Sequence, residues 1–146
     1  MGKEVGVIAD WLQALARHPL ILVMLGGAIG TAARYGISRW LGAYPWAQTF
    51  PFATLVINVS GSFILGLTVV LIRERLPIEY HDWYFLIGTG FCGGYTTFST
   101  FEWETFQLIR DGSWWLALSN VGGSVLAGFF GVVIAVVLAG AILPRQ

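Results

Sequence analysis

The sequence is poor in cysteine and in charged side chains, and both deficits restrict its class. The single cysteine, Cys92, excludes an internal disulfide and a metal site built from cysteines. Charged residues make up 11% of the 146 residues, whereas soluble domains carry roughly a quarter. The 8 basic residues balance the 8 acidic ones, so no excess positive charge favours a nucleic-acid partner. Together these deficits exclude an ordinary soluble domain.

Hydrophobic residues make up 56% of the chain, and they gather in four long segments. A largely uncharged stretch of about 20 residues spans the hydrocarbon core of a bilayer as a helix. We therefore expect membrane-spanning helices at about residues 19–41, 52–72, 83–108 and 114–143. The connectors between these helices are too short to form a separate soluble domain. The sequence predicts an all-α membrane protein in which residues 19–146 form one four-helix transmembrane domain.

Residues 1–18 form a leader before the first predicted span. Charged residues interrupt this leader, which argues against a secretory signal. Its apolar residues recur at helical spacing, as Val5, Ile8, Trp11, Leu12 and Leu15. This spacing is typical of a helix that lies on the membrane surface, and an unstructured leader is the alternative.

Basic residues are distributed almost evenly between the two sides of the membrane. Four spans place both termini on one side. The five basic residues on that side are Lys3, Arg17, Arg73, Arg75 and Arg145, and the three on the other side are Arg34, Arg39 and Arg110. So weak a bias leaves two orientations open, namely cytoplasmic termini or insertion of the chain both ways.

Small and polar residues inside the predicted spans follow helical spacing. Gly26 and Gly30 are one turn apart, and such pairs let helix backbones pack closely, which favours a tight bundle and a homo-oligomer. Asn58 stands one turn before Ser62. An amide in apolar surroundings needs a partner, since leaving it unsatisfied costs about 2–7 kcal/mol. Asn58 is therefore expected either to bond a neighbouring helix or to line a polar path.

The third predicted span contains residues that form a poor α-helix. A pair of glycines is followed shortly by two β-branched threonines, which predicts an interruption between about Gly93 and Thr97. Backbone groups freed at membrane depth need protein, water or an ion as partners. The two helix ends at such a break also carry partial charges. An ion site is therefore favoured over a simple kink.

The side chains within the spans favour an anion over a cation. Arg34 is the only basic side chain well inside a predicted span, where a charge usually lines a wet cavity or finds a partner. The central parts of the spans contain no Asp or Glu, which proton-coupled cation carriers generally need. Phe98 and Phe101 follow the expected break, and the positive edges of their rings can contact an anion.

Three runs of residues resemble the CrcB/Fluc family of fluoride channels. They are residues 26–35 (GGAIGTAARY), 54–63 (TLVINVSGSF) and 90–101 (GFCGGYTTFSTF), the last followed three residues later by Glu104. The third run is highly specific, and the match covers nearly the whole chain after the leader. The resemblance implies passive export of cytoplasmic fluoride across the cell (inner or plasma) membrane, without catalysis.

The resemblance also implies an assembly and a metal ion. Family members form a homodimer of subunits in opposite orientations, with two fluoride pores built from both subunits. A structural sodium ion at the dimer centre is held by backbone carbonyls that correspond to Gly93 and Thr96. The residues expected in the pores are Arg34 (near a vestibule), Asn58 (as a hydrogen-bond donor), Thr97, Phe98, Ser99, Phe101 and Ser124.

The fourth span departs from the family pattern at one position. Asn120 lies one turn before Ser124, where the resemblance leads us to expect another hydrogen-bonding residue such as an aromatic hydroxyl. Whether Asn120 belongs to the pore lining is therefore left open.

Two other classes of protein share some of these features. A proton-coupled small multidrug exporter also has four spans and dual topology, but it needs a glutamate in its first span, and residues 19–41 contain no Asp or Glu. A noncatalytic accessory subunit would use the polar residues only to join helices. The run between Gly93 and Phe101 is more elaborate than that role requires.

Overall fold

The computed structural model describes residues 4, 11 and 17–142, and every regular element among them is helical. The expected all-α fold is therefore confirmed for this part of the chain. The leader, residues 1–18, falls mostly outside the described residues. The choice between a surface helix and an unstructured leader thus stays a prediction.

Three helical stretches in the described chain are long and apolar enough to cross a membrane. They are α2 (Pro19–Gly42), α3 (Phe52–Thr68) with its π-helical continuation η2 (Val69–Arg75), and α6 (Trp114–Ile142). These stretches coincide with the first, second and fourth predicted spans. The connectors are short and contain single turns of 3-10 helix, η1 (Pro45–Ala47) and η3 (Ile78–Tyr80).

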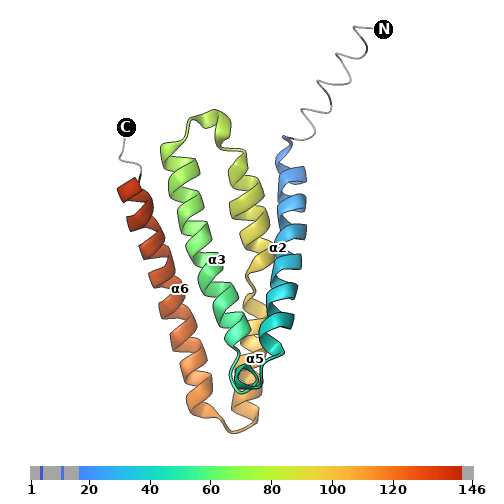
Figure 1. The fold of residues 1–146 in the computed structure, drawn as a ribbon, viewed down its shortest axis with the longest axis vertical. Helices are drawn as coiled ribbons and strands as arrows, with labels where there is room; N and C mark the ends of the chain where they lie inside the picture. The colour runs from blue at the N-terminus through green and yellow to red at the C-terminus, as the bar shows by residue number, and fades with distance from the viewer. Residues whose placement is uncertain (1–3, 5–10, 12–16, 143–146) are drawn as a thin grey trace.

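The third predicted span is divided into fragments that are each too short to cross a membrane alone. They are a π-helix η4 (Phe85–Cys92), a single turn α4 (Gly93–Tyr95) and α5 (Phe98–Arg110). Thr96 and Thr97, which lie between α4 and α5, are extended, with ψ angles of 159° and 119°. The interruption predicted between Gly93 and Thr97 is therefore confirmed. The fragments follow one another beside α2 and α3 (Figure 1).

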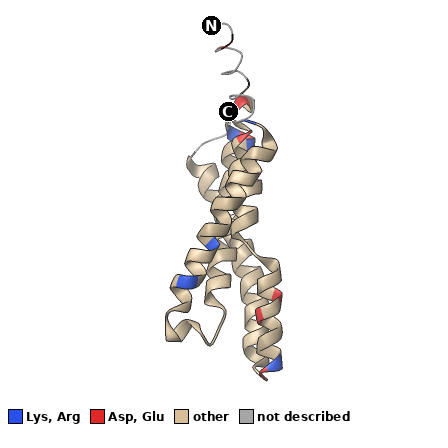
Figure 2. Cartoon of the chain, turned by 90° about the vertical axis from the view of Figure 1, so that its right-hand side faces the viewer, with Lys and Arg blue, Asp and Glu red and all other residues tan. Residues whose placement is uncertain are grey.

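The long helices pack around these fragments. Helix α2 lies against η4 and α4, while α3 lies against α6. Toward one end the chain parts into two legs, one formed by α2 with α3 and the other by α5 with α6 (Figure 2). Charged side chains lie at the end of the molecule where α2 begins and along the two legs, and the stretch of the bundle between them is almost free of charge (Figure 2).

Glycines bring the backbones of α2 and η4 into direct contact. A Cβ atom added at Gly26 would collide with the carbonyl oxygen of Leu86, and one at Gly30 with that of Phe91. From the opposite side, a Cβ at Gly90 would lie 2.8 Å from the Val23 carbonyl oxygen. The close packing predicted from the spacing of Gly26 and Gly30 is confirmed, and it fixes η4 on α2.

Large apolar side chains cover much of the outer surface. Trp115 is 83% exposed, Val137 is 64% exposed and Phe129 is 63% exposed, all on α6. Soluble monomers rarely present so much apolar surface to water. The outer face of the bundle is therefore suited to lipid or to a second protein chain.

Candidate functional site

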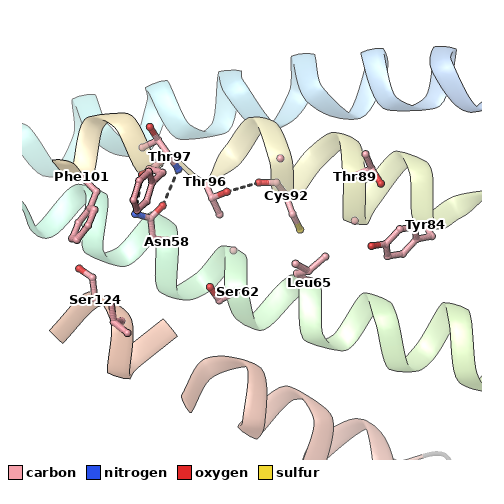
Figure 3. Close-up of a pocket in the computed structure, with 15 residues that line it drawn as sticks. Asn58, Ser62, Leu65, Tyr84, Thr89, Cys92, Thr96, Thr97, Phe101 and Ser124 are labelled. Carbon is pink, nitrogen blue, oxygen red and sulfur yellow. Dashed lines mark hydrogen bonds between the residues drawn. The ribbon is translucent and has the colours of Figure 1, made fainter. Parts of the chain in front are cut away.

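A cavity of about 530 Å³ lies between α3, the interrupted third span and α6 (Figure 3). Most of the residues predicted to form a pore or to hold sodium line this cavity: Asn58, Gly93, Thr96, Thr97, Phe98, Phe101 and Ser124. All of its lining residues are uncharged. The fold thus brings hydrogen-bonding groups and phenyl rings together in a space without fixed charges.

The Asn58 amide is bound to the backbone of the break. Its Oδ1 atom accepts the Thr97 amide at 2.8 Å, and its Nδ2 atom donates to the Thr97 carbonyl at 3.1 Å (Figure 3). This pair of bonds supplies the partner that a half-buried amide needs. Because the amide nitrogen carries two hydrogens, one of them remains for the cavity that Asn58 lines. Asn58 can therefore join two helices and still donate into the cavity.

The backbone carbonyls of Gly93 and Thr96 at the break receive no hydrogen bond from the described part of the chain. In a continuous α-helix the Thr97 amide would bond the Gly93 carbonyl, but here it bonds Asn58. The Thr100 amide would bond the Thr96 carbonyl, but it donates instead to Thr97 Oγ1 at 3.3 Å. The carbonyl oxygens of Gly93 and Thr96 are therefore free to take another partner.

The carbonyls of Cys92 and Gly94 are already occupied. Cys92 accepts the Thr96 amide at 3.0 Å and the Thr96 hydroxyl at 2.9 Å, and Gly94 accepts the Thr31 hydroxyl at 3.4 Å. No group of three His, Cys, Asp or Glu side chains that could hold a metal occurs within the residues described. Since hard cations prefer oxygen ligands, the free carbonyls of Gly93 and Thr96 fit the sodium expected there.

Phe98 and Phe101 lie on the first turn of α5, directly after the break. Their ring centroids are 5.9 Å apart, and both rings border the cavity. The hydroxyl of Thr97 caps this helix, which fixes where its first turn begins. Phe98 is 70% exposed, whereas Phe101 is half-buried. The Phe98 side chain is thus left mostly uncovered by the rest of the chain.

Asn120 is wholly buried and does not line the cavity. Its Nδ2 atom donates to Thr105 Oγ1 at 2.8 Å, and its Oδ1 atom accepts the Ser124 hydroxyl at 3.4 Å. Thr105 in turn donates to the Phe101 carbonyl at 2.8 Å. Asn120 therefore links Ser124 on α6 to the helix that carries the phenylalanines.

Arg34 and Ser99 are the two predicted pore residues that lie outside the cavity. Arg34 is half-buried on α2 and has no ion-pair partner among the residues that the structure describes. Ser99 is exposed on the first turn of α5. Neither side chain therefore borders the cavity at the break.

Glu104, which follows the third of the runs that carry the resemblance, is a half-buried acidic residue to which the sequence assigned no role. It lines a second cavity of about 320 Å³, between residues 47–51 and α5. Its Oε2 atom is enclosed and receives no hydrogen bond from the described chain, while the carboxyl contacts the Thr54 side chain. Glu102, two residues earlier, is exposed. Helical periodicity was the available signal, because it places only one of these two acids on the packed face.

The chain is similar to known proteins over most of its length. Residues 21–136 match the family model described as CrcB-like protein, Camphor Resistance (CrcB). A protein from Solibacter usitatus named fluoride-specific ion channel FluC is 45% identical over 127 residues, which cover 86% of this chain and 98% of that protein. A FluC from Pyrococcus furiosus is 47% identical over 118 residues, covering 81% and 93% of the two chains. A third, from Pyrococcus horikoshii, is 41% identical over 120 residues, covering 82% and 94%.

Proposed function

Because the chain belongs to the CrcB family, a family of ion channels and not of enzymes, we propose that it is a fluoride-selective channel. Cytoplasmic fluoride would leave passively, down its own gradient, through the cell (inner or plasma) membrane. The relatives named as fluoride-specific channels support fluoride as the ion. The observation that carries the proposal is the uncharged cavity at the break, where an amide, hydroxyl groups and phenyl rings converge.

The cavity offers the kind of contacts that fluoride requires. Fluoride is small and strongly hydrated, so its passage demands donors at close range in place of water. The second N–H of Asn58 and the ring edges of Phe98 and Phe101 provide such donors. The Ser124 hydroxyl, held by a bond of 3.4 Å to Asn120, can turn toward an ion. Several weak sites in series would let the ion leave again.

Thr97 has a different part in this proposal. Its amide and carbonyl bond Asn58, and its hydroxyl donates to Thr100 Oγ1 at 3.0 Å. All three polar groups are therefore engaged within the protein. We assign Thr97 to shaping the pore, since it orients the Asn58 amide and begins the helix that carries the two phenylalanines.

We propose that η4, α4 and α5 together cross the membrane, so that the chain has four crossings and this segment is the third of them. The three fragments follow one another beside α2 and α3, and the start of α2 lies at the same end of the molecule as the end of α6 (Figure 1). An even number of crossings has this result. A break at membrane depth is tolerated because side chains of α3 satisfy its backbone groups, as Asn58 does.

We further propose an antiparallel homodimer with two pores. Phe98 and Gly93, both assigned to the interior of the channel, are exposed on the single subunit. A second copy related by a twofold axis would cover them and would duplicate the cavity, which yields two equivalent pores. The even distribution of basic residues is compatible with insertion in both orientations. Arg34 and Ser99 would then reach a vestibule and a pore formed with the partner.

A structural sodium ion would lie at the centre of this dimer. The carbonyl oxygens of Gly93 and Thr96 would hold it, and the partner would add its own pair, because two oxygen ligands are fewer than a hard cation takes. The bound ion would supply a fixed positive charge that offsets part of the desolvation cost of a nearby anion. The chain's own groups would do the rest: they hold the break open and direct donors into the cavity.

The proposal is tested by ion efflux from liposomes that contain the purified full-length protein. We expect rapid release of fluoride and no release of chloride above that of protein-free liposomes, measured with ion-selective electrodes. Equal efflux of the two halides would contradict selectivity. Release of neither, from liposomes shown to contain folded protein, would contradict the channel itself.

A further inference from the structure

The last turn before the break is fixed by Tyr95, a residue that none of the predicted roles includes. Tyr95 is 4% exposed, although it lies on a helix of a single turn. Its ring stacks on that of Phe91, with centroids 5.3 Å apart and an interplanar angle of 16°. The ring is therefore held on one face by η4, and its hydroxyl is directed toward α3.

The Tyr95 hydroxyl meets Ser60 of α3, with 2.9 Å between the two oxygen atoms. The Ser60 hydroxyl has a single hydrogen, which it donates to the Val56 carbonyl at 2.6 Å. Tyr95 must therefore be the donor and Ser60 the acceptor. The bond joins the turn before the break to a neighbouring helix, across 35 residues of sequence.

A neighbouring glycine shows how closely α3 approaches the break. A Cβ atom added at Gly61 would collide with the Thr96 Cγ2 atom and would lie 3.2 Å from the Tyr95 ring. Asn58, one turn earlier on α3, bonds Thr97 on the far side of the break. Helix α3 thus holds the break on both sides, with Thr96 and its free carbonyl between the two attachments.

We propose that Tyr95 is a positioning residue whose hydrogen bond to Ser60 sets the direction of the free Gly93 and Thr96 carbonyls, and thereby the affinity for a sodium ion. The hydrogen bonds of Asn58 fix only Thr97, which comes after both of these carbonyls in the chain. Without the Tyr95 bond, the turn formed by Gly93–Tyr95 keeps its stacking on Phe91 but loses its attachment to α3. The inference rests on the sodium site of the proposed function.

The test compares hydroxyl deletions in the full-length protein. Tyr95→Phe keeps the stacked ring, Ser60→Ala removes the acceptor, and the double variant removes both. Equilibrium binding of ²²Na⁺ to the purified protein is measured alongside fluoride efflux at saturating sodium. We expect each single variant to weaken sodium binding about fivefold, as for the loss of one hydrogen bond. The double variant should be weaker than either single variant by less than about twofold, because all three lack the same bond.

Two controls separate positioning from a general loss of structure. Tyr80→Phe on the exposed turn η3 and Ser38→Ala on the exposed face of α2 delete the same groups elsewhere, and both should bind sodium as the wild type does. Ser60→Thr retains an acceptor and should restore binding to within about twofold of the wild type. This last variant keeps the proposal testable if removal of the hydroxyl impairs folding.

Unchanged sodium binding in Tyr95→Phe, or losses that multiply in the double variant, would overturn the inference. So would a wild-type protein that binds no sodium, since the carbonyls would then have no cation to hold. A wild type that binds sodium but releases no fluoride contradicts the proposed function alone, because the binding comparison between variants still stands.

Discussion

The two sides of the third span are built in opposite ways. On the side that faces α2, glycines have no side chain, so the two backbones are in direct contact, as at Gly30 and Phe91. On the side of α3 and α6, the same span borders a cavity of about 530 Å³ with polar and aromatic walls. The tightly packed side fixes the position of the span. The open side can therefore carry an interruption and unsatisfied groups without loss of the fold.

Gly30→Val has the largest expected effect, because it attacks the packed side. The first added atom would overlap the Phe91 carbonyl, a backbone group that cannot turn aside. Overpacking of this kind destabilises by about 3 kcal/mol or more. We expect no monodisperse protein on gel filtration. Gly36→Val on the same helix, where an added Cβ meets nothing within 4 Å, is the matched control and should elute normally. Normal elution of Gly30→Val would erase the contrast between the two sides.

Asn58→Asp attacks the open side by placing a negative charge in the cavity. Like charges at 4 Å repel by about 4 kcal/mol at an intermediate effective dielectric, so we expect fluoride efflux to fall at least about 100-fold. The carboxylate also faces the Thr97 carbonyl, where the amide had donated. Efflux from liposomes and gel filtration are measured on the same preparation. Unchanged efflux with normal elution would remove Asn58 from the ion path.

Phe98→Ile and Phe101→Ile remove the ring edges but keep apolar side chains. We expect each variant to lose fluoride efflux by at least about tenfold while the oligomeric state is retained, because the aromatic quadrupole is lost and little else changes. Phe106→Ile, at a 52% exposed position of the same helix, is the matched control. Efflux at the wild-type rate in both cavity variants would reduce the two rings to filling side chains.

Asn120→Leu has the smallest expected effect on transport and sharpens the comparison. It breaks the bonds to Thr105 and Ser124 inside the wall of the open side. We expect the free energy of unfolding in detergent to fall by about 1–2 kcal/mol, which is the loss expected when a buried hydrogen bond is removed. Fluoride efflux should fall only about two- to fivefold. A tenfold loss of efflux at unchanged stability would instead place Asn120 in the ion path.

The break itself was predictable, because it depends on local preferences. Paired glycines and β-branched threonines disfavour an α-helix wherever they stand, so the extended backbone at Thr96 and Thr97 follows from nearby residues. The three long apolar helices were predictable for a similar reason, since the transfer of side chains into lipid adds up along the chain.

The partners of the polar residues were not predictable in the same way. Asn58 was expected to bond a helix or line a path, and its attachment to both backbone groups of Thr97 could not be read from spacing. The burial of Asn120 and the position of Arg34 outside the cavity were equally hidden. Each depends on how far a helix is rotated about its axis, which hydrophobicity specifies weakly when every face of the helix is apolar.

The sequence alone determined the membrane class, the location of the apolar segments and the point at which the third one is interrupted, because solvation and backbone preference act residue by residue. Only the tertiary structure decided which carbonyls stay free and which hydroxyl holds them in place. Those outcomes depend on contacts between distant residues, such as Ser60 with Tyr95, and on the close approach of backbones at Gly26, Gly30 and Gly61.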